Sequence, residues 1–272
     1  MLLMLGDCLE KMAEIPDGSV DMILADLPYG TTACKWDSVI PFEPLWAHYK
    51  RVTKKNAAIV LTASQPFTSA LVMSCRECFR YEWVWRKNQG VNPMAAKIQP
   101  LRNHENICIF YQRAPTYNPQ MWGSFPYSSF SSSNGKKIGE VYGGCKSKHR
   151  DNTDGTRYPL TVLDVKMEKG GKHPTQKPVA LMEYLIRTYT NEGETVLDNC
   201  AGSFTTAIAC INTGRKFIGI ERDAGYFDVG LRRVQKRLES SSSFQGADVH
   251  VSYGMTDTCI SDSPICSPRL AS

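Results

Sequence analysis

Short apolar runs alternate with amphipathic segments in the first 86 residues of the chain. Four runs have the length of strands, and three segments between them repeat hydrophobic residues with helical spacing. The predicted strands cover Met1–Leu5, Val20–Ala25, Ala57–Thr62 and Phe79–Trp85, and the predicted helices cover Cys8–Glu14, Phe42–Val52 and Pro66–Ser74. This order predicts βαβ units, whose strands lie parallel in one sheet.

The same alternation returns near the carboxyl end of the chain. Helices are predicted over Pro178–Tyr189, Thr205–Asn212 and Ala224–Leu238, with strands over Thr195–Leu197 and Lys216–Ile220. Between Arg86 and Gly171 the pattern is irregular, and only Asn106–Tyr111 is strand-like. We therefore predict a doubly wound, mostly parallel α/β sheet, in which residues 1–86 and 172–239 flank an insertion over residues 87–171. Residues 240–272 are serine-rich without sustained periodicity, which predicts a flexible tail.

The composition restricts the class of protein without deciding its function. With 272 residues and 42% hydrophobic content, the chain can bury a substantial core. A net charge of +5 suits a phosphate-bearing partner, but it suits many ordinary enzymes equally well. No apolar run approaches the ~20 residues that a membrane-spanning helix needs, so no membrane role is predicted.

Cysteine usage predicts a reducing compartment. The ten cysteines lack the spacing of a disulfide framework, and the first residues lack the basic flank and cleavage site of a secretory signal. Cys75 and Cys78 have the Cys-x-x-Cys spacing, but no second pair of ligands follows at a suitable interval. We therefore expect a cytoplasmic protein without a metal site.

The segment Asp26-Leu27-Pro28-Tyr29 follows a buried strand, at the position where open α/β sheets bind ligands. Its residue types suit chemistry on an exocyclic amino nitrogen, which is a poor nucleophile because its lone pair is delocalised into the ring. Hydrogen bonds accepted by the Asp26 carboxylate and the Leu27 carbonyl favour a geometry in which that pair attacks. Pro28 stiffens the turn, and Tyr29 offers a flat face to a base rotated out of a duplex. Similar residues also follow strands that bind nothing, so further motifs must decide.

A second strand, loop and helix are typical of a cofactor-binding turn. Asp198 ends the strand, and Gly202-Ser203-Phe204-Thr205 leads into the helix. Glu221 ends the next strand, at the spacing where an acidic side chain accepts hydrogen bonds from ribose hydroxyls. A nicotinamide dehydrogenase shares this spacing, but the loop lacks the full Gly-x-Gly-x-x-Gly pattern, and a dehydrogenase leaves the Asp26 segment unexplained.

Three segments resemble motifs of the DNA amino-methyltransferases. Asp26-Leu27-Pro28-Tyr29 is similar to their Asp-Pro-Pro-Tyr motif, with leucine in place of the first proline. The loop after Asp198 is similar to their S-adenosylmethionine motif, which usually has glycine at the position of Phe204. His173–Pro178 closely resembles the segment that precedes this motif in β-type members. The order of the motifs is the circularly permuted β-type order, and it implies a Rossmann-like methyltransferase fold.

The resemblance also implies roles for individual residues. Asp7 is implied to face the adenine of the cofactor, while Thr175 and Lys177 border its methionine portion. The complete predicted site consists of catalytic Asp26, Leu27, Pro28 and Tyr29, and cofactor-binding Asp7, Thr175, Lys177, Asp198, Gly202, Ser203, Thr205 and Glu221.

The activity implied by the resemblance is site-specific methylation of adenine N6 in double-stranded DNA, with S-adenosylmethionine as the methyl donor. Methylation of cytosine N4 is the nearest alternative, although aspartate at position 26 favours adenine in this family. The departures at Leu27 and Phe204 leave a catalytically silent DNA-binding relative as another alternative. The resemblance is to stand-alone bacterial or phage enzymes, for which a homodimer and a cognate restriction endonuclease are further candidate partners.

The irregular insertion is the predicted target-recognition region. Its basic side chains are candidates for phosphate contacts, and its amides are candidates for reading bases. The basic candidates are Arg86, just before the insertion, and Lys87, Lys97, Arg102, Lys136, Lys137, Lys146, Lys148 and Arg150 within it.

Overall fold

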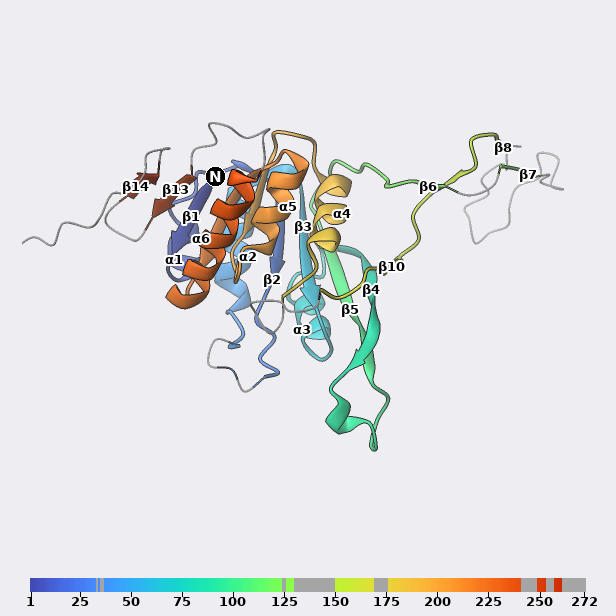
Figure 1. The fold of residues 1–272 in the computed structure, drawn as a ribbon, viewed down its shortest axis with the longest axis horizontal. Helices are drawn as coiled ribbons and strands as arrows, with labels where there is room; N and C mark the ends of the chain where they lie inside the picture. The colour runs from blue at the N-terminus through green and yellow to red at the C-terminus, as the bar shows by residue number, and fades with distance from the viewer. Residues whose placement is uncertain are drawn as a thin grey trace, which may run out of the picture. The chain divides into compact units, whose positions relative to one another are not determined.

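The computed structural model of the chain describes residues 1–32, 34, 37–123, 126–129, 150–168, 176–240, 249–252 and 257–260. It contains two compact units, one formed by Met1–Asn118 with Thr161–Ser272 and the other by Pro119–Leu160. In the first unit, ten described strands form one sheet (Figure 1). In spatial order they are β10 (Val162–Asp164), β4 (Phe79–Val91), β5 (Arg102–Phe110), β3 (Thr53–Ala63), β2 (Val20–Asp26), β11 (Thr195–Asp198), β12 (Lys216–Glu221), β1 (Leu2–Leu5), β13 (Val249–Ser252) and β14 (Asp257–Ile260). Neighbouring strands are parallel, except that β5 runs antiparallel to β3 and β4, and β14 to β13.

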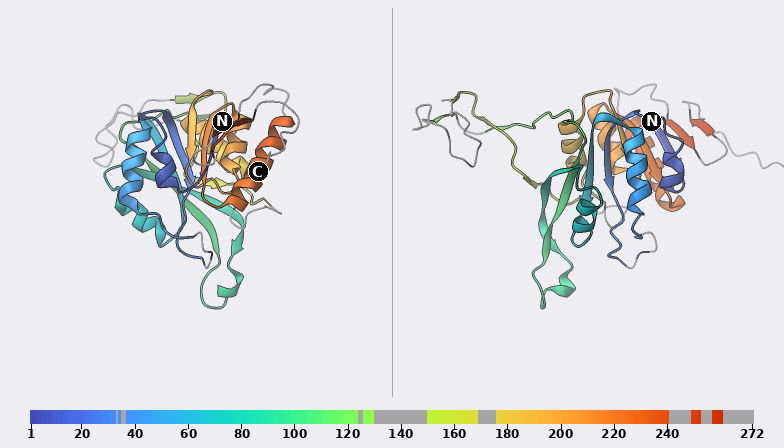
Figure 2. Two further views of the ribbon diagram at one scale, coloured as in Figure 1. Left: turned by 90° about the vertical axis from the view of Figure 1, so that its left-hand side faces the viewer. Right: turned by 180° about the vertical axis from the view of Figure 1, so that it is seen from behind.

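Helices cover both faces of this sheet (Figures 1 and 2). One face carries α1 (Cys8–Met12), α2 (Phe42–Val52) and α3 (Phe67–Ser74), and the other carries α4 (Val179–Tyr189), α5 (Thr205–Thr213) and α6 (Ala224–Glu239). In the described part of the chain, no helix has the length and apolarity needed to cross a bilayer. Met22 and Leu24 of β2 pack in the core with α4, α5 and α6, whereas Ile23 and Ala25 pack with α1, α2 and α3. The predicted doubly wound α/β fold is confirmed.

Strand β2 lies at the junction of the two halves of the chain. On one side it pairs with β3, where Asp26 is in register with Thr62, and on the other side it pairs with β11, where Ile23 is in register with Leu197. Because β1, β2, β11 and β12 all run in the same direction, their carboxyl ends lie along one edge of the sheet. The two segments singled out by sequence, after Asp26 and after Asp198, therefore belong to adjacent strands.

The sheet extends into the segment that was predicted to be an insertion. β4 continues to Val91, β5 begins at Arg102, and β10 lies at Val162–Asp164. The outer half of β4 is largely exposed, so it lacks the apolar alternation by which a strand is recognised in a sequence. The second unit, Pro119–Leu160, is therefore shorter than the predicted insertion over residues 87–171. Its described residues form two small strand pairings, of β6 (Trp122–Gly123) with β9 (Thr156–Arg157), and of β7 (Tyr127–Ser129) with β8 (Arg150–Asn152).

The prediction of a flexible tail over residues 240–272 is wrong for two segments. β13 pairs in parallel with β1, and β14 pairs with β13. The backbone N–H of His250 donates to the carbonyl of Met1 at 2.9 Å, and Val249 and Val251 are buried. A four-residue strand carries too little periodicity to be recognised locally, and it forms here because the edge of β1 offers unpaired backbone groups.

Phe204 has a backbone conformation that normally requires glycine. Its φ of 57° lies in the left-handed region, which costs an ordinary residue about 1–2 kcal/mol. The ring is fully buried and packs edge-on against Phe217 and Phe227, with ring centroids 6.3 and 5.4 Å away. A Cβ added to Gly230 of α6 would lie 2.3 Å from Cδ2 of Phe204. The ring therefore fills a space under α6 that the absence of a side chain at Gly230 provides.

We expect the effect of Gly230→Ala on stability to change sign with the residue at position 204. In the wild-type background, the added methyl group collides with the Phe204 ring and should cost about 1–3 kcal/mol. In the Phe204→Gly background the ring is absent, so alanine should stabilise the middle of α6 by up to ~1 kcal/mol. Urea denaturation of the wild type, Gly230→Ala, Phe204→Gly and the double variant measures the coupling between the two positions. Additive effects on the free energy of unfolding would contradict the packing described.

Candidate active site

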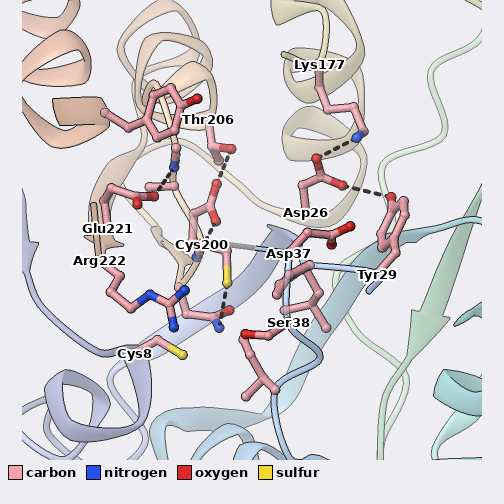
Figure 3. A pocket seen from close by; sticks show the side chains of 18 of the residues that line it. Cys8, Asp26, Tyr29, Asp37, Ser38, Lys177, Cys200, Thr206, Glu221 and Arg222 are labelled. Carbon is pink, nitrogen blue, oxygen red and sulfur yellow. Dashed lines mark hydrogen bonds and ion pairs between the residues drawn. The ribbon is translucent and has the colours of Figure 1, made fainter. Parts of the chain in front are cut away.

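A cavity of about 270 Å³ opens at the carboxyl ends of β1, β2, β11 and β12 (Figure 3). Residues from both halves of the chain line it. Of the predicted site residues, those that line the cavity are Asp7, Asp26, Leu27, Pro28, Tyr29, Lys177, Asp198, Gly202, Ser203, Thr205 and Glu221. Thr175, together with the preceding residues of the His173–Pro178 segment, lies outside the described residues. The fold thus brings the two predicted loops to one cavity.

The carboxylate of Asp26 is held by three side chains. The Tyr29 hydroxyl donates to Oδ1 at 2.8 Å, and the Thr62 hydroxyl on the neighbouring strand donates to the same oxygen. The Lys177 ammonium donates to Oδ2 at 2.5 Å (Figure 3). These contacts fix the carboxylate at the cavity, and Oδ2 keeps a lone pair for another donor.

The ring of Tyr29 is positioned by an aromatic neighbour. Its ring stacks on Phe67, with centroids 5.2 Å apart and an angle of 26° between the planes, so one ring face is covered. Lys177 Nζ lies 5.8 Å from the ring centroid. Burial, together with the nearby charge of Asp26, raises the pKa of the Tyr29 hydroxyl well above its usual value. The phenol therefore stays protonated and acts as a donor to Asp26.

The loop after β2 is anchored at both ends. The side chain of Leu27 is 4% exposed and packs in the core with α1, α2 and α3. Asp37 accepts hydrogen bonds from the backbone N–H groups of Gly30–Thr32 at 2.7 to 2.9 Å. Burial opposes ionisation of Asp37, but the hydrogen bonds outweigh it and lower the pKa. Leucine at position 27 thus contributes a core contact, and Asp37 braces the loop.

Glu105, on β5, is a further member of the site that the sequence did not reveal. Lys87 Nζ lies 2.5 Å from its Oε1, and Lys177 Nζ lies 3.3 Å from its Oε2. Burial would raise the pKa of Glu105, but the charges of Lys177 and Lys87 lower it. Burial would likewise lower the pKa of Lys177, but Asp26 and Glu105 raise it. Two carboxylates and two ammonium groups therefore form one charge-balanced cluster.

This cluster changes the interpretation of several basic residues. Lys87, a predicted phosphate contact, has a side chain only 8% exposed and is bound to Glu105, so that prediction is wrong. Arg86 pairs with Asp164, and Arg102 donates to Ser64 at 2.6 Å. Of the remaining candidates, Lys97 is exposed, Arg150 belongs to β8, and Lys136, Lys137, Lys146 and Lys148 lie outside the described residues.

The loop after β11 faces the cavity from the opposite side to Asp26. Gly202 has φ of 51°, and an added Cβ there would meet no atom within 4 Å. The two Glu221 oxygens accept hydrogen bonds from the backbone N–H groups of Gly202 and Asp223, each at 2.7 Å. Burial raises the pKa of Glu221. The loop is therefore shaped by a carboxylate that still has lone pairs directed to other donors.

Asp198 and Asp7 also have local structural roles. Asp198 accepts from the Thr206 hydroxyl at 2.6 Å and from the backbone N–H of Cys200 at 3.1 Å. Burial raises the pKa of Asp198 to about 7. Asp7 caps α1 by accepting from the backbone N–H of Leu9 at 2.9 Å.

Among the charged side chains that line the cavity, acidic groups outnumber basic groups. The acidic group comprises Asp7, Asp26, Asp37, Glu105, Asp198 and Glu221, whereas the basic group comprises Lys177 and Arg222. Such a lining suits a ligand with positive charges and disfavours the pyrophosphate of a dinucleotide. It therefore weighs against the dehydrogenase alternative.

A cluster outside this cavity bears on the expectation of no metal site. Donor atoms of Cys75, Glu77 and Cys78 lie within 4.8 Å of one another. Burial raises the pKa of the Cys75 thiol to about 12, and the thiol donates to Glu77 at 3.3 Å. In the structure these residues form a hydrogen-bonded cluster at the end of α3.

Comparison with known proteins gives consistent results for sequence and structure. The family model described as DNA methylase, for the N6 and N4 methyltransferases, matches residues 20–232. DNA adenine methyltransferase YhdJ of Escherichia coli (strain K12) is 31% identical over 243 residues, covering 84% of this chain and 81% of that protein. Type II methyltransferase M2.DpnII of Streptococcus pneumoniae is 26% identical over 267 residues, covering 89% of this chain and 92% of that protein.

Solved structures share the fold. The complex of M1.HpyAVI with S-adenosylmethionine has a TM-score of 0.58 at 24% identity, covering 86% of this chain and all of that chain (100%). The cytosine-N4-specific PvuII DNA methyltransferase has a TM-score of 0.61 at 15% identity, covering 87% of this chain and 89% of that chain. At these identities the likeness concerns the fold.

We expect Asp198→Asn to remove a pH dependence of stability. Because the folded-state pKa of about 7 lies above the ordinary value of 3.8, the protonated carboxyl stabilises the fold at low pH. This contribution is lost as the pH rises from about 4 to about 7, at a rate approaching ~1.4 kcal/mol per pH unit. Asparagine does not titrate, so the stability difference between the two proteins should change over this range. Urea titrations of the ligand-free proteins measure it, and parallel curves would contradict the raised pKa.

Proposed function

Because the chain belongs to the DNA methylase family, we propose that it transfers a methyl group from S-adenosylmethionine to adenine N6 at specific sites in double-stranded DNA. One observation carries this proposal. The Asp26 carboxylate, held by Lys177, Tyr29 and Thr62, lines the same cavity as the glycine loop that ends at Thr205. The name of the relative YhdJ, a DNA adenine methyltransferase, supports adenine as the base.

The cavity has the properties that S-adenosylmethionine requires. Its acidic lining suits the sulfonium and ammonium charges, and the open space beside Gly202 leaves room for close approach to the backbone. We assign Glu221 to the ribose hydroxyls, Asp7 to the adenine side, and the loop from Asp198 to Thr205 to the methionine portion. S-adenosylmethionine supplies an electrophilic methyl carbon whose leaving group is a neutral thioether.

The residues of the chain position the nucleophile. Asp26 Oδ2 and the Leu27 carbonyl accept hydrogen bonds from the amino group, which orients the nitrogen lone pair toward the cofactor loop. Tyr29 and Thr62 occupy Oδ1 and hold the carboxylate in one orientation. Since alignment of two bound reactants supplies much of the rate in such displacements, no covalent intermediate is needed. The nitrogen that gains the methyl group releases one proton to water.

Structure weakens the argument for a catalytically silent relative. That alternative rested on Leu27 and Phe204, yet Leu27 packs in the core and Phe204 is fully buried under α6. Phe204 is not among the residues that line the cavity. Cytosine N4 remains the alternative target, because a similar amino group and ring nitrogen would meet Asp26.

Partners and organisation complete the proposal. We assign target recognition to the region of the predicted insertion, which includes the unit Pro119–Leu160. A homodimer and a cognate restriction endonuclease are proposed partners, and the cytoplasm of a bacterial or phage-infected cell is the proposed location. The Type II name of the relative M2.DpnII supports the link to restriction systems.

Expression in a methylation-deficient bacterial host tests the activity. We expect N6-methyladenine at one recurrent DNA sequence when the host genome is sequenced for modified bases. Nucleoside mass spectrometry distinguishes it from N4-methylcytosine. Asp26→Asn keeps the shape of the side chain but removes one acceptor oxygen, and it should lower kcat by about 100-fold or more. An unmodified genome with folded wild-type protein, or full activity of the variant, would refute the proposal.

Calorimetry tests the cofactor assignment separately. Glu221→Gln replaces an acceptor oxygen by a donor, so one of the two loop amides loses its partner and the ribose contact weakens. We expect S-adenosylmethionine to bind this variant about tenfold more weakly or worse. Asp26→Asn is the matched control and should bind the cofactor within about threefold of wild type. Equal affinities for all three proteins would contradict the assignment of Glu221.

A further inference from the structure

Lys177 is placed to do more than neutralise Asp26. Its side chain is 6% exposed, yet the residue lines the cavity beside Asp26 and Glu105. An ammonium group has three donor hydrogens. One is used by Asp26 Oδ2 at 2.5 Å, and a second faces Glu105 Oε2 at 3.3 Å. Among the described residues no third acceptor is bound to this ammonium group, so a third donor remains next to Asp26 Oδ2.

We propose that Asp26 and Lys177 act as a pair that reads the edge of the flipped base, with Lys177 donating to the ring nitrogen beside the amino group. This inference rests on the proposed function. Adenine and cytosine each present an amino donor next to a ring nitrogen acceptor, which matches a carboxylate next to an ammonium group. Guanine and thymine present a carbonyl oxygen next to a ring N–H at the corresponding edge. The oxygen would face Asp26, and the N–H would face Lys177, so both contacts would be unfavourable.

Glu105 and Lys87 explain how the ammonium group is kept at this position. An isolated buried lysine is expensive, whereas Lys177 has carboxylates on two sides. Glu105 is held in turn by Lys87 at 2.5 Å, and Lys87 does not line the cavity. Lys177 therefore has little freedom to follow another ligand, and its ammonium group stays beside Asp26.

The test removes the ring nitrogen and the lysine separately. Once the methylated site has been mapped, duplexes are made with adenine or with 1-deazaadenine, which has a C–H group at that ring position, at the target. For the wild type, we expect kcat/KM to fall about tenfold or more with the analogue. The analogue pairs more weakly in the duplex and therefore flips out more easily. Easier flipping would raise kcat/KM, so it cannot be the cause of the expected fall. For Lys177→Met, the ratio of kcat/KM on the adenine duplex to kcat/KM on the 1-deazaadenine duplex should approach one.

Lys87→Met is the matched control, because it removes a similarly buried lysine bound to the same Glu105 but outside the cavity. It should retain the discrimination between the two duplexes, whatever its absolute rate. The inference would be overturned if Lys177→Met discriminates between the two duplexes as strongly as the wild type. It would also be overturned if both Lys177→Met and Lys87→Met lose this discrimination. If Lys177→Met does not fold, equal rates of the wild type on both duplexes still refute it. A folded wild type that modifies neither duplex contradicts the proposed function itself.

Discussion

Asp26 and Lys177 are 151 positions apart in the chain, and their charged groups meet at 2.5 Å beside the cavity. Both are largely withdrawn from water, so each charge is stabilised by the other. This constraint links the loop after β2 to the segment before α4, and through Glu105 and Lys87 it extends to β5 and β4. The loop after β2, the segment before α4 and the strands β4 and β5 are thus held in one geometry by a balanced set of charges. The shape of the cavity depends on that geometry because Asp26, Glu105 and Lys177 all line it.

The architecture of the sheet makes this meeting achievable. Adjacent parallel strands β2 and β11 come from opposite halves of the chain, and their carboxyl ends present Asp26 and Asp198 to the same edge. A circular permutation changes the order of β2 and β11 along the chain but not their pairing in the sheet. Asp26 and Asp198 therefore stay at the same edge of the sheet. The acidic character of the lining then selects the ligand, because it favours a sulfonium compound over a pyrophosphate.

Phe204 illustrates how a departure from a motif is accommodated in the core. Its left-handed backbone is strained, but its ring is buried against Phe217 and Phe227, and Gly230 leaves space for it. Burial of an aromatic side chain contributes ~2–3 kcal/mol, which exceeds the ~1–2 kcal/mol of backbone strain. The substitution therefore alters packing beneath the glycine loop while the loop itself still faces the cavity.

The sequence by itself determined the alternation of strands and helices, the two loops that carry Asp26 and Gly202, and their order along the chain. These features are encoded by residues close together, through periodicity, turn chemistry and motif spacing. Only the tertiary structure decided that Thr62 and Glu105 belong to the site, that Lys87 supports Glu105 from outside it, and that Lys177 binds Asp26. It also decided that Val249–Ser252 completes the sheet beside β1. The physical reason is the same in each case: an ion pair or a strand edge is satisfied by a partner far along the chain, and such a partner leaves no local pattern.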